Sequence, residues 1–398
     1  MTLANCSLNP SGVTNIYLNS FRPKREWKAA TFLGQAVTGR FEYSANAATP
    51  QRAWYYTYDT VAKTVTTVGM ETFDASFNVT GRTQFIGLVS STALAMGQSE
   101  SVDFTVKSLV PAQPDRPERQ TLTYEANEVV TLPGGRVDTC RVKSTVYDLA
   151  GGTASELSVE TLHLVPGFGF VKSYYKPTAS TYADRNQTYL TELVSTTGSL
   201  TLAAPTADTA PPLAQCSALP VGQTLVLTAS AAGEENSAVR TISNSTFNGT
   251  PAISIVRRNV TTNVKRSEHF FDPAVGFLRY VGVDSYDVTG STLVQRRARS
   301  GRPDLRTTGP STPAVGYTET YTVLIPANGG TSTSTDTFTF DGYAKITTPA
   351  GTFDTCKVTF HYGADGIDET YYHAPNLHWV RLDSTANGVR TTRELISH

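Results

Sequence analysis

The chain has 398 residues, of which 39% are hydrophobic and 17% charged, and 33 basic against 34 acidic residues leave a formal net charge of −1. That length predicts two or three domains, and the apolar content excludes a disordered chain. The even charge excludes a broad nucleic-acid-binding surface. The one basic cluster, Arg296 to Arg302, is interpreted as a solvated loop because Gly301 and Pro303 interrupt it. No apolar run reaches the roughly 18 residues of a transmembrane segment.

Aromatic and β-branched residues dominate the chain, with 19 Tyr and 17 Phe. Cys356, Val358 and Phe360 alternate with the polar residues Lys357 and Thr359. This period of two predicts antiparallel strands with one wet face. A helix is expected only from Ser91 to Ser99, where the pattern is short and poorly capped. The predicted fold class is therefore mainly β, with little helix.

The sequence contains an internal repeat. Residues 3–6 (LANC) recur as 213–216 (LAQC), residues 133–140 match 349–356, and residues 192–195 match 394–397. The matches keep their order along the chain, and the offset changes where turns differ in length, as expected of a tandem duplication. We predict two similar antiparallel domains, 1–200 and 213–398, each a curved sheet or half-barrel. An Ala/Thr/Pro-rich linker, 201–212, joins them.

Each copy contains two cysteines at matching positions. Of the three connectivities that four cysteines allow, only Cys6–Cys140 with Cys216–Cys356 joins the same positions within each copy. Two such disulfides favour an exported protein, periplasmic or extracellular. No signal peptide opens the chain, so export implies that one has been removed.

Two alternatives to this cysteine pairing stay open. One is a cytosolic protein with buried free thiols. The other is a lipid on Cys6, since residues 3–6 look like a lipoprotein cleavage signal, although the same string recurs in mid-chain before Cys216. Zinc is disfavoured, because no Cys-x-x-Cys or matching His spacing is present.

No catalytic motif is found. The chain lacks a Gly-x-Ser-x-Gly elbow, a His-Glu-x-x-His helix, a phosphate loop and a dinucleotide fingerprint. No catalytic residue, metal or cofactor is predicted, and an unrecognised enzyme is kept only as a third hypothesis. If residues 369–373 form a strand, Glu369, Tyr371 and His373 share a face that could bind a metal or transfer protons. Polar variation on an exposed face is the preferred interpretation.

Two acidic pairs occupy matching positions in the copies, and both are interpreted as solvated turns. Asp284 and Asp287 match Glu71 and Asp74. Calcium is conceivable there, but the ligand spacing of a calcium loop is missing.

Two segments carry a family resemblance. Residues 349–358 with 369–372, and the string from Pro166 to Lys172 (PGFGFVK), resemble a pattern in exported bacterial β-proteins allied to the periplasmic lipoprotein-carrier superfamily. The resemblance implies a strongly curved antiparallel sheet, often wrapped over helices, whose concave face binds acyl chains. Asn376 and His378 stand where the pattern has turn glycines, and the covering helices are hard to find here.

Two functional hypotheses follow. The first is a non-enzymatic exported binding protein with an apolar ligand, such as a lipid or acyl group, on the concave sheet faces. The second is an extracellular structural or cell-surface module that self-assembles through sheet edges. Ligand contact is predicted at the hairpin tips: an apolar, mobile tip in the first copy, and a polar tip with one large aromatic in the second. These residues are Phe168, Phe170, His373, His378 and Trp379.

Overall fold

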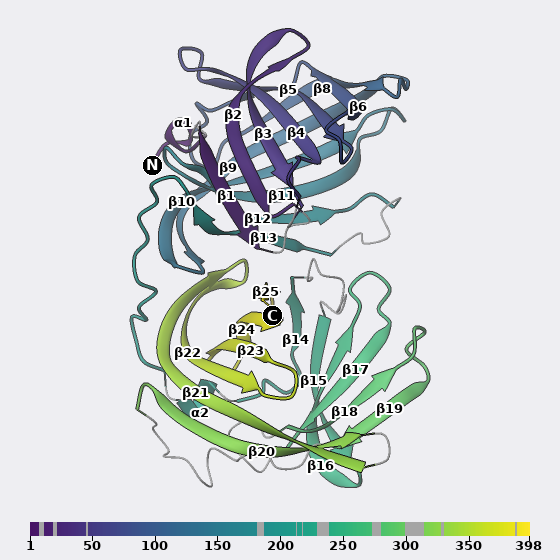
Figure 1. Cartoon of the computed structure of the whole chain (residues 1–398), viewed down its shortest axis with the longest axis vertical. Helices are drawn as coiled ribbons and strands as arrows, with labels where there is room; N and C mark the ends of the chain where they lie inside the picture. The colour runs from purple at the N-terminus through teal and green to yellow at the C-terminus, as the bar shows by residue number, and fades with distance from the viewer. Residues whose placement is uncertain are drawn as a thin grey trace. The chain divides into compact units, whose positions relative to one another are not determined.

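The computed structural model describes residues 1–7, 12–18, 22–44, 47–180, 187–211, 213–216, 218–228, 239–272, 280–298, 314–327, 330–386 and 388–398. The chain divides into two compact units, Met1–Ala204 and Pro205–His398 (Figure 1). Both are built from antiparallel strands, and helix amounts to 2% of the chain. The prediction of a mainly β, helix-poor protein is confirmed.

The first unit contains one short helix and the following strands: α1 Leu3–Cys6, β1 Val13–Leu18, β2 Lys24–Phe32, β3 Gln35–Tyr43, β4 Arg52–Asp59, β5 Thr64–Phe73, β6 Val79–Ile86, β7 Val89–Ser91, β8 Ser99–Val110, β9 Arg116–Leu132, β10 Gly135–Asp148, β11 Ser155–Val165, β12 Gly169–Pro177 and β13 Tyr189–Thr196. The helix expected from Ser91 to Ser99 is wrong: β7 ends and β8 begins at those two residues.

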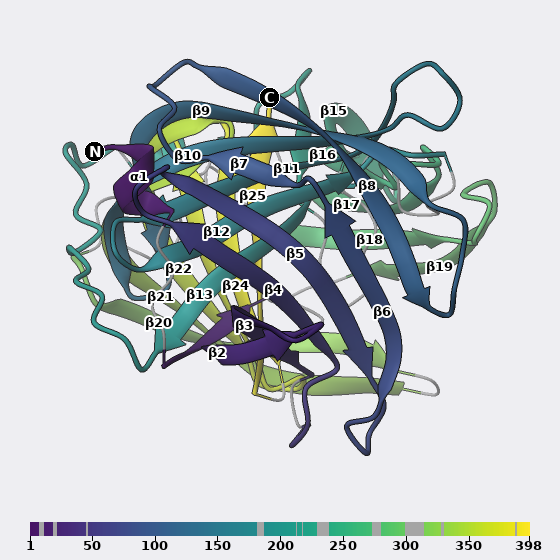
Figure 2. The ribbon, with the colours of Figure 1, turned by 90° about the horizontal axis from the view of Figure 1, so that it is seen from above.

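The sheet of the first unit closes on itself. Its order is β4-β3-β2-β1-β13-β12-β11-β10-β9-β8-β6-β5-β7, and β4 also pairs with β5. Twelve strands therefore form a closed barrel, in which the long strands β9 and β10 run side by side (Figure 2). For this unit the expected curved sheet or half-barrel is corrected. The pairing of β4 with β5 removes the open edge, and alternation along single strands does not specify such a pairing.

Apart from a counterpart of β7, the described residues of the second unit show the same element order: α2 Leu213–Cys216, β14 Thr224–Leu227, β15 Val239–Phe247, β16 Thr250–Arg258, β17 Lys265–Phe271, β18 Tyr280–Tyr286, β19 Leu293–Ala298, β20 Tyr317–Ala327, β21 Gly330–Thr348, β22 Gly351–Tyr362, β23 Ile367–Ala374, β24 His378–Ala386 and β25 Val389–Ser397. The order in its curved sheet is β19-β18-β17-β16-β15-β14-β25-β24-β23-β22-β21-β20. Among the described residues this sheet ends on β19 and β20, whereas the corresponding strands β6 and β8 pair in the first unit.

In both units the first strand pairs with the last. Tyr17 of β1 lies opposite Leu193 of β13, and Leu227 of β14 lies opposite Leu395 of β25. All four side chains are buried. These pairings join the two ends of each unit, so the apolar residues on either side of the junction bury one another.

A disulfide ties the short helix of each unit to its sheet. Cys6 of α1 is bonded to Cys140 of β10, and Cys216 of α2 to Cys356 of β22, with Cα–Cα distances of 6.2 and 6.1 Å. This is the pairing that the repeat favoured. Because Cys140 alternates in phase with Val142, its sulfur lies in a core with Leu3 and Tyr124.

We expect the double substitution Cys6→Ala/Cys140→Ala to lower the free energy of unfolding by about 2–5 kcal/mol, because the bridge spans 134 residues and restricts the unfolded chain. Urea denaturation followed by circular dichroism measures the change. Cys216→Ala/Cys356→Ala should cost a similar amount, since its loop spans 140 residues. An unchanged midpoint in either variant would contradict the expectation.

Candidate functional site

The concave face of the first unit is charged rather than apolar. The guanidinium of Arg25 on β2 lies 5.0 Å from the ring centre of Phe170 on β12 and 4.5 Å from that of Tyr17. Strands β2 and β12 are three places apart in the sheet, so only a concave face brings these side chains together. Tyr17 stacks on Phe170 at 4.9 Å and donates a hydrogen bond to its carbonyl oxygen.

Glu42 on β3 is the centre of this face. Its carboxylate lies 3.9 Å from Arg25, 2.9 Å from Arg40 and 2.6 Å from Arg52, and the residue is 1% exposed. Burial by itself would raise the pKa of Glu42, but Arg40, Arg25 and Arg52 outweigh it and hold the pKa at about 2. Three arginines thus share one buried carboxylate. Their attraction to Glu42 offsets part of the free-energy cost of removing these charges from water.

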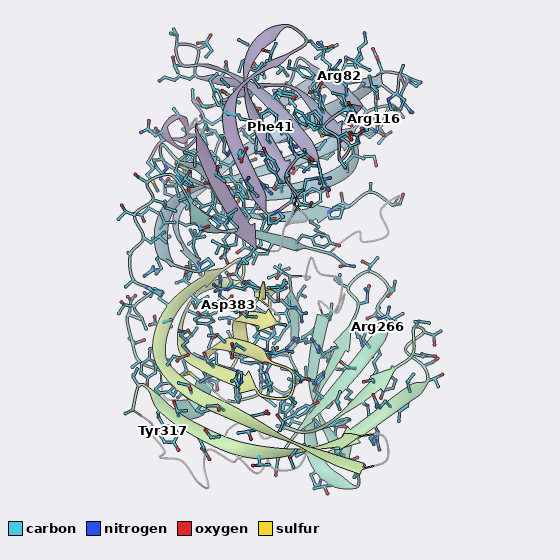
Figure 3. All side chains as sticks on the ribbon, viewed as in Figure 1. Phe41, Arg82, Arg116, Arg266, Tyr317 and Asp383 are labelled. Carbon is cyan, nitrogen blue, oxygen red and sulfur yellow. A yellow bond between two sulfur atoms is a disulfide. The ribbon has the colours of Figure 1, made fainter. Side chains whose placement is uncertain are left out.

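The other face of β3 carries a separate aromatic core. Phe41, labelled in Figure 3, packs there with Phe32 and Tyr55. Tyr55 donates a hydrogen bond to Glu71, which also pairs with Arg82. The strands of this part of the barrel are therefore packed on both faces.

The second unit keeps the same cation–aromatic contact. Arg240 of β15 lies 4.3 Å from the ring centre of Trp379 on β24, again across three places in the sheet order. Arg240 corresponds to Arg25 and Trp379 to Phe170. The opposite residue differs, because Arg25 faces Glu42 across the ladder, whereas Arg240 faces Arg257.

Three histidines gather on this concave face. Arg257 Nη1 lies 3.2 Å from Nε2 of His269, and the rings of His373 and His378 are 5.7 Å apart. Together with Arg240, we call these five residues the histidine–arginine cluster. Trp379 and Tyr371 pack beside it, Tyr371 stacking on His373 at 5.6 Å.

The histidines of the β23–β24 hairpin are held neutral. Burial lowers the pKa of His373 to about 3. Burial also lowers the pKa of His378 well below its ordinary value, with further contributions from His373 and Arg240. Burial lowers the pKa of both Arg240 and Arg257 to about 9, and Arg393 adds to the effect. The cluster therefore places arginine charge in poorly solvated surroundings.

His378 also has an unusual backbone conformation. Its φ is +61°, and that of Asn376 is +58°, while the corresponding residues of the first unit are Gly169 and Gly167 at +87° and +69°. Glycine adopts this left-handed region without a steric penalty, whereas a histidine with φ above zero is uncommon. The sequence showed the loss of the glycines; the structure shows that the turn is kept without them.

The predicted contact residues are not exposed tips. Phe168 and Phe170 are 4% and 8% exposed and belong to the core around Val171, so the mobile apolar tip is wrong. His373, His378 and Trp379 are also buried, so the polar tip is wrong as well. The sequence predicted these five residues at exposed hairpin ends, because the sequence alone does not show that the hairpin residues pack into the core. The structure does bring these last three residues together, and their role in ligand binding stays a prediction.

The predicted strand over residues 369–373 is present as β23, and Glu369, Tyr371 and His373 lie on one face of it. Tyr371 donates a hydrogen bond to Glu369, and burial, followed by Glu369, raises the Tyr371 pKa well above its ordinary value. Within the described ranges, no group of three or more His, Cys, Asp or Glu side chains is placed to hold a metal ion.

The acidic pairs have structural partners. The solvated-turn interpretation is wrong for Asp284 and Glu71, which are buried on β18 and β5: Asp284 accepts two hydrogen bonds from Arg296, and Glu71 pairs with Arg82. Asp74 and Asp287 accept backbone hydrogen bonds within their own turns. Of the basic cluster, Arg296 and Arg297 lie on β19, so the loop interpretation is wrong for these two, and Arg299 and Arg302 lie outside the described residues.

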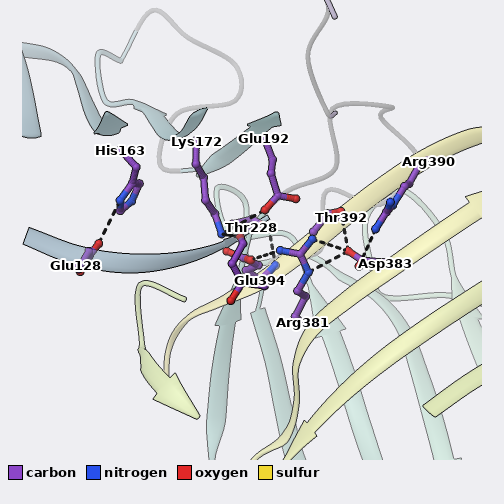
Figure 4. Close-up of polar contacts among 11 residues, drawn as sticks. Glu128, His163, Lys172, Glu192, Thr228, Arg381, Asp383, Arg390, Thr392 and Glu394 are labelled. Carbon is purple, nitrogen blue, oxygen red and sulfur yellow. Dashed lines mark hydrogen bonds and ion pairs between the residues drawn. The ribbon is translucent and has the colours of Figure 1, made fainter. Parts of the chain in front are cut away.

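Each unit also pairs a buried cation on its penultimate strand with a buried carboxylate on its last. Lys172 lies 3.4 Å from Glu192 in the first unit, and Arg381 lies 2.7 Å from Glu394 in the second (Figure 4). Arg381 also contacts Asp383 at 3.0 Å. These pairs occupy corresponding positions, and in each the attraction between opposite charges offsets part of the cost of burying them.

Sequence reasoning missed Arg25, Glu42, Arg240, Arg257 and His269. Each lies on a strand whose alternation is visible, but only the pairing register places Arg240 opposite Arg257. No signal in a single sequence specifies that register.

Fold and site together define the class of protein: antiparallel β units, each with its own internal disulfide and with charged side chains on its concave face. No family model and no curated protein matches the chain. One solved structure, from Bacteroides fragilis and described as a candidate exported protein with a YmcC-like fold, is similar over 47% of this chain and 96% of its own, at 10% identity and a TM-score of 0.26. Similarity of this size supports no conclusion about function. No helix among the described residues has the length and apolarity of a membrane span.

The buried histidines predict a pH-dependent stability. His373 has a folded pKa of about 3, against about 6.5 in the unfolded chain, so below pH 6.5 the unfolded chain binds the proton first. Stability contributed by neutral His373 is therefore present above pH 6.5 and is lost as the pH falls. As the pH falls from 6 to 4, we expect protonation of His373 in the unfolded chain to lower the free energy of unfolding by up to about 1.4 kcal/mol per pH unit.

His373→Leu introduces the residue found at the corresponding position of the first unit. It should remove the contribution of His373 to the slope of unfolding free energy against pH. Urea denaturation at pH 7, 6, 5 and 4 provides the measurement. Tyr372→Leu, on the opposite face of β23, is the control: it should lower stability at every pH without changing the slope. A His373→Leu slope equal to that of the wild type would refute the prediction.

Proposed function

We propose that the chain is an exported, non-enzymatic binding protein made of two duplicated β units, and that its first unit binds an apolar ligand such as an acyl chain. The two disulfides support export to the periplasm or the cell exterior, because such bonds persist in oxidising compartments. The shared strand order and the corresponding disulfides support the duplication. The ligand site differs from the original expectation, since the concave faces carry arginines and carboxylates.

The observation that carries the proposal is a groove of about 460 Å³ in the first unit. Its size lies within the range of about 300–1,000 Å³ that is usual for small-molecule sites. Most of its wall is apolar. We call it the hairpin groove, and its lining residues are Met1, Arg136, Val137, Asp138, Val165, Pro166, Thr201, Leu202 and Ala203.

Backbone hydrogen bonds hold one wall of the groove in place. The amide of Arg136 donates to the carbonyl of Ala203 at 2.7 Å, and the amide of Ala203 donates back at 2.8 Å. Gly135 permits this approach: its φ is +149°, and a Cβ there would lie 2.5 Å from the Ala203 oxygen. Leu202 is thereby fixed against the β9–β10 hairpin, and Arg136 and Asp138 supply polar groups at the same groove.

We expect a fluorescent fatty acid to bind the full chain and Leu202→Glu to weaken this binding at least about tenfold, because the substitution places a charge against the apolar wall. Titration followed by probe fluorescence measures the affinity, and native mass spectrometry of protein purified without detergent tests for a co-purifying ligand. Ser199→Glu, an exposed position outside the groove, is the matched control and should bind as the wild type does. No uptake by the wild type, or equal uptake by Leu202→Glu, would refute this function.

A second candidate function is an extracellular structural or cell-surface interaction module. It is favoured by β19, where the sheet of the second unit ends among the described residues and Val294 is 67% exposed. An uncovered edge strand with apolar side chains is a natural site for pairing with another chain.

This candidate predicts self-association at high protein concentration, measured by size exclusion with light scattering. Val294→Lys should reduce it, since edge charges oppose strand pairing. Val288→Lys, which changes an 81% exposed turn residue in the same way, should leave it unchanged. A strict monomer at all concentrations would exclude self-assembly.

A further inference from the structure

The most informative difference between the units is a single ladder position on the concave face. In the first unit the position opposite Arg25 holds Glu42, whose carboxylate lies within 3.9 Å of three arginines. In the second unit the position opposite Arg240 holds Arg257. A carboxylate has been replaced by a guanidinium, while the arginine facing it has been kept.

Two like charges directly opposite each other on paired strands repel, and the repulsion is strongest where water is excluded. Arg240 is 6% exposed, and its Nε has no hydrogen-bond partner among the described residues. The Arg240 guanidinium lies against the ring of Trp379, as the Arg25 guanidinium lies against the ring of Phe170 in the first unit. An aromatic ring attracts a cation but carries no negative charge. It also cannot accept the N–H hydrogen bonds that the guanidinium donates in its own plane.

Among the described residues, one carboxylate acts electrostatically on both arginines, and its side chain has a further partner. Glu369 favours the charged form of Arg240 and Arg257, yet its side chain accepts a hydrogen bond from Tyr371. His269 lies 3.2 Å from Arg257 through its Nε2, but an imidazole ring is neutral or positively charged and supplies no countercharge. Arg393 adds a third positive charge near the pair.

The neighbouring side chains have also become smaller. Arg40 and Arg52, which approach Glu42 in the first unit, correspond by register to Ile255 and Ser267 in the second. Two long cations are thus replaced by a short apolar and a short polar residue. The replacement removes the side chains that would otherwise reach toward the same place.

We propose that the second unit binds an oxyanion, a single carboxylate or phosphate group, between Arg240 and Arg257, where it takes the part that Glu42 plays in the first unit. Guanidinium groups offer paired N–H donors that match the two oxygens of such a group. His378, whose Nδ1 has no hydrogen-bond partner among the described residues, lies in the same cluster. Carboxylate and phosphate share this chemistry, whether free in solution or part of a larger ligand.

Isothermal titration calorimetry of the full chain with inorganic phosphate, and separately with acetate, tests the proposal at constant ionic strength. We expect binding of at least one of the two. Phosphate alone would identify a phosphorylated ligand class, whereas both, or acetate alone, would identify a carboxylate-accepting site. Arg257→Glu supplies the internal carboxylate of the first unit, so it should weaken the binding at least about tenfold while the chain stays folded.

Arg258→Glu makes the same charge change one residue further on, on the other face of β16, and should bind as the wild type does. If Arg257→Glu fails to fold by circular dichroism, Arg257→Gln replaces it and should weaken binding in the same direction. The absence of heat with both anions, or equal binding by wild type and the Arg257 variant, would overturn the proposal. Fatty-acid uptake in the hairpin groove depends on the first unit, so either result can fail without the other.

Discussion

The pairing of first strand with last is the contact on which the rest of each unit depends. Strands β1 and β13 lie at opposite ends of the first unit's sequence, and β14 and β25 do so in the second. Such long-range pairing is entropically costly, because the chain between the two strands must be ordered before the contact forms. The disulfide reduces that cost: Cys6 precedes β1 closely, and its bond to Cys140 holds the start of the chain near strands that form the later part of the sheet. The pairing of first strand with last bends each sheet, and it is this bend that brings the side chains of the concave face together.

Much of the architecture was accessible from sequence, for identifiable reasons. Alternation around Cys356 and Val358 predicted strands, and a repeated cysteine position predicted the bridges. The strings around Cys6 and Cys216 were not predicted to be helical, yet they form α1 and α2, which at four residues each are too short to show a helical period. The closure of the first sheet was missed because it depends on β4 meeting β5. Single-strand patterns carry no information on which strands meet.

The site was predicted less well than the fold. His373, His378 and Trp379 do lie close together, because the hairpin brings residues near in sequence into contact. The arginines that complete the cluster come from strands more than a hundred residues away. The direction of the hairpin was also misjudged: Phe170 follows Gly169 and was predicted to lie at an exposed tip, yet it stacks on Tyr17 in the core. A hydrophobic residue next to a turn glycine is equally consistent with both places, and only tertiary packing decides.

The two units illustrate how one framework carries different chemistry. The arginine, the aromatic side chain beneath it and the cation–carboxylate pair on the last strands are shared. The residue across the ladder from that arginine differs: it is a carboxylate, Glu42, in the first unit and a guanidinium, Arg257, in the second. A change of this kind alters which charge is present and leaves the pairing of the strands as it is.

The placement of the disulfide also determines how the first unit would respond to mechanical tension. A force applied through the residues before Cys6 passes along the sulfur–sulfur bond to Cys140 and continues through β10 to β13. The 134-residue stretch between the two cysteines, with a contour length of about 450 Å, bears none of that load while the bond is intact. Only the strands after Cys140 can be drawn out, so reduction of a single bond would decide whether the unit extends by a third of its chain or by nearly all of it.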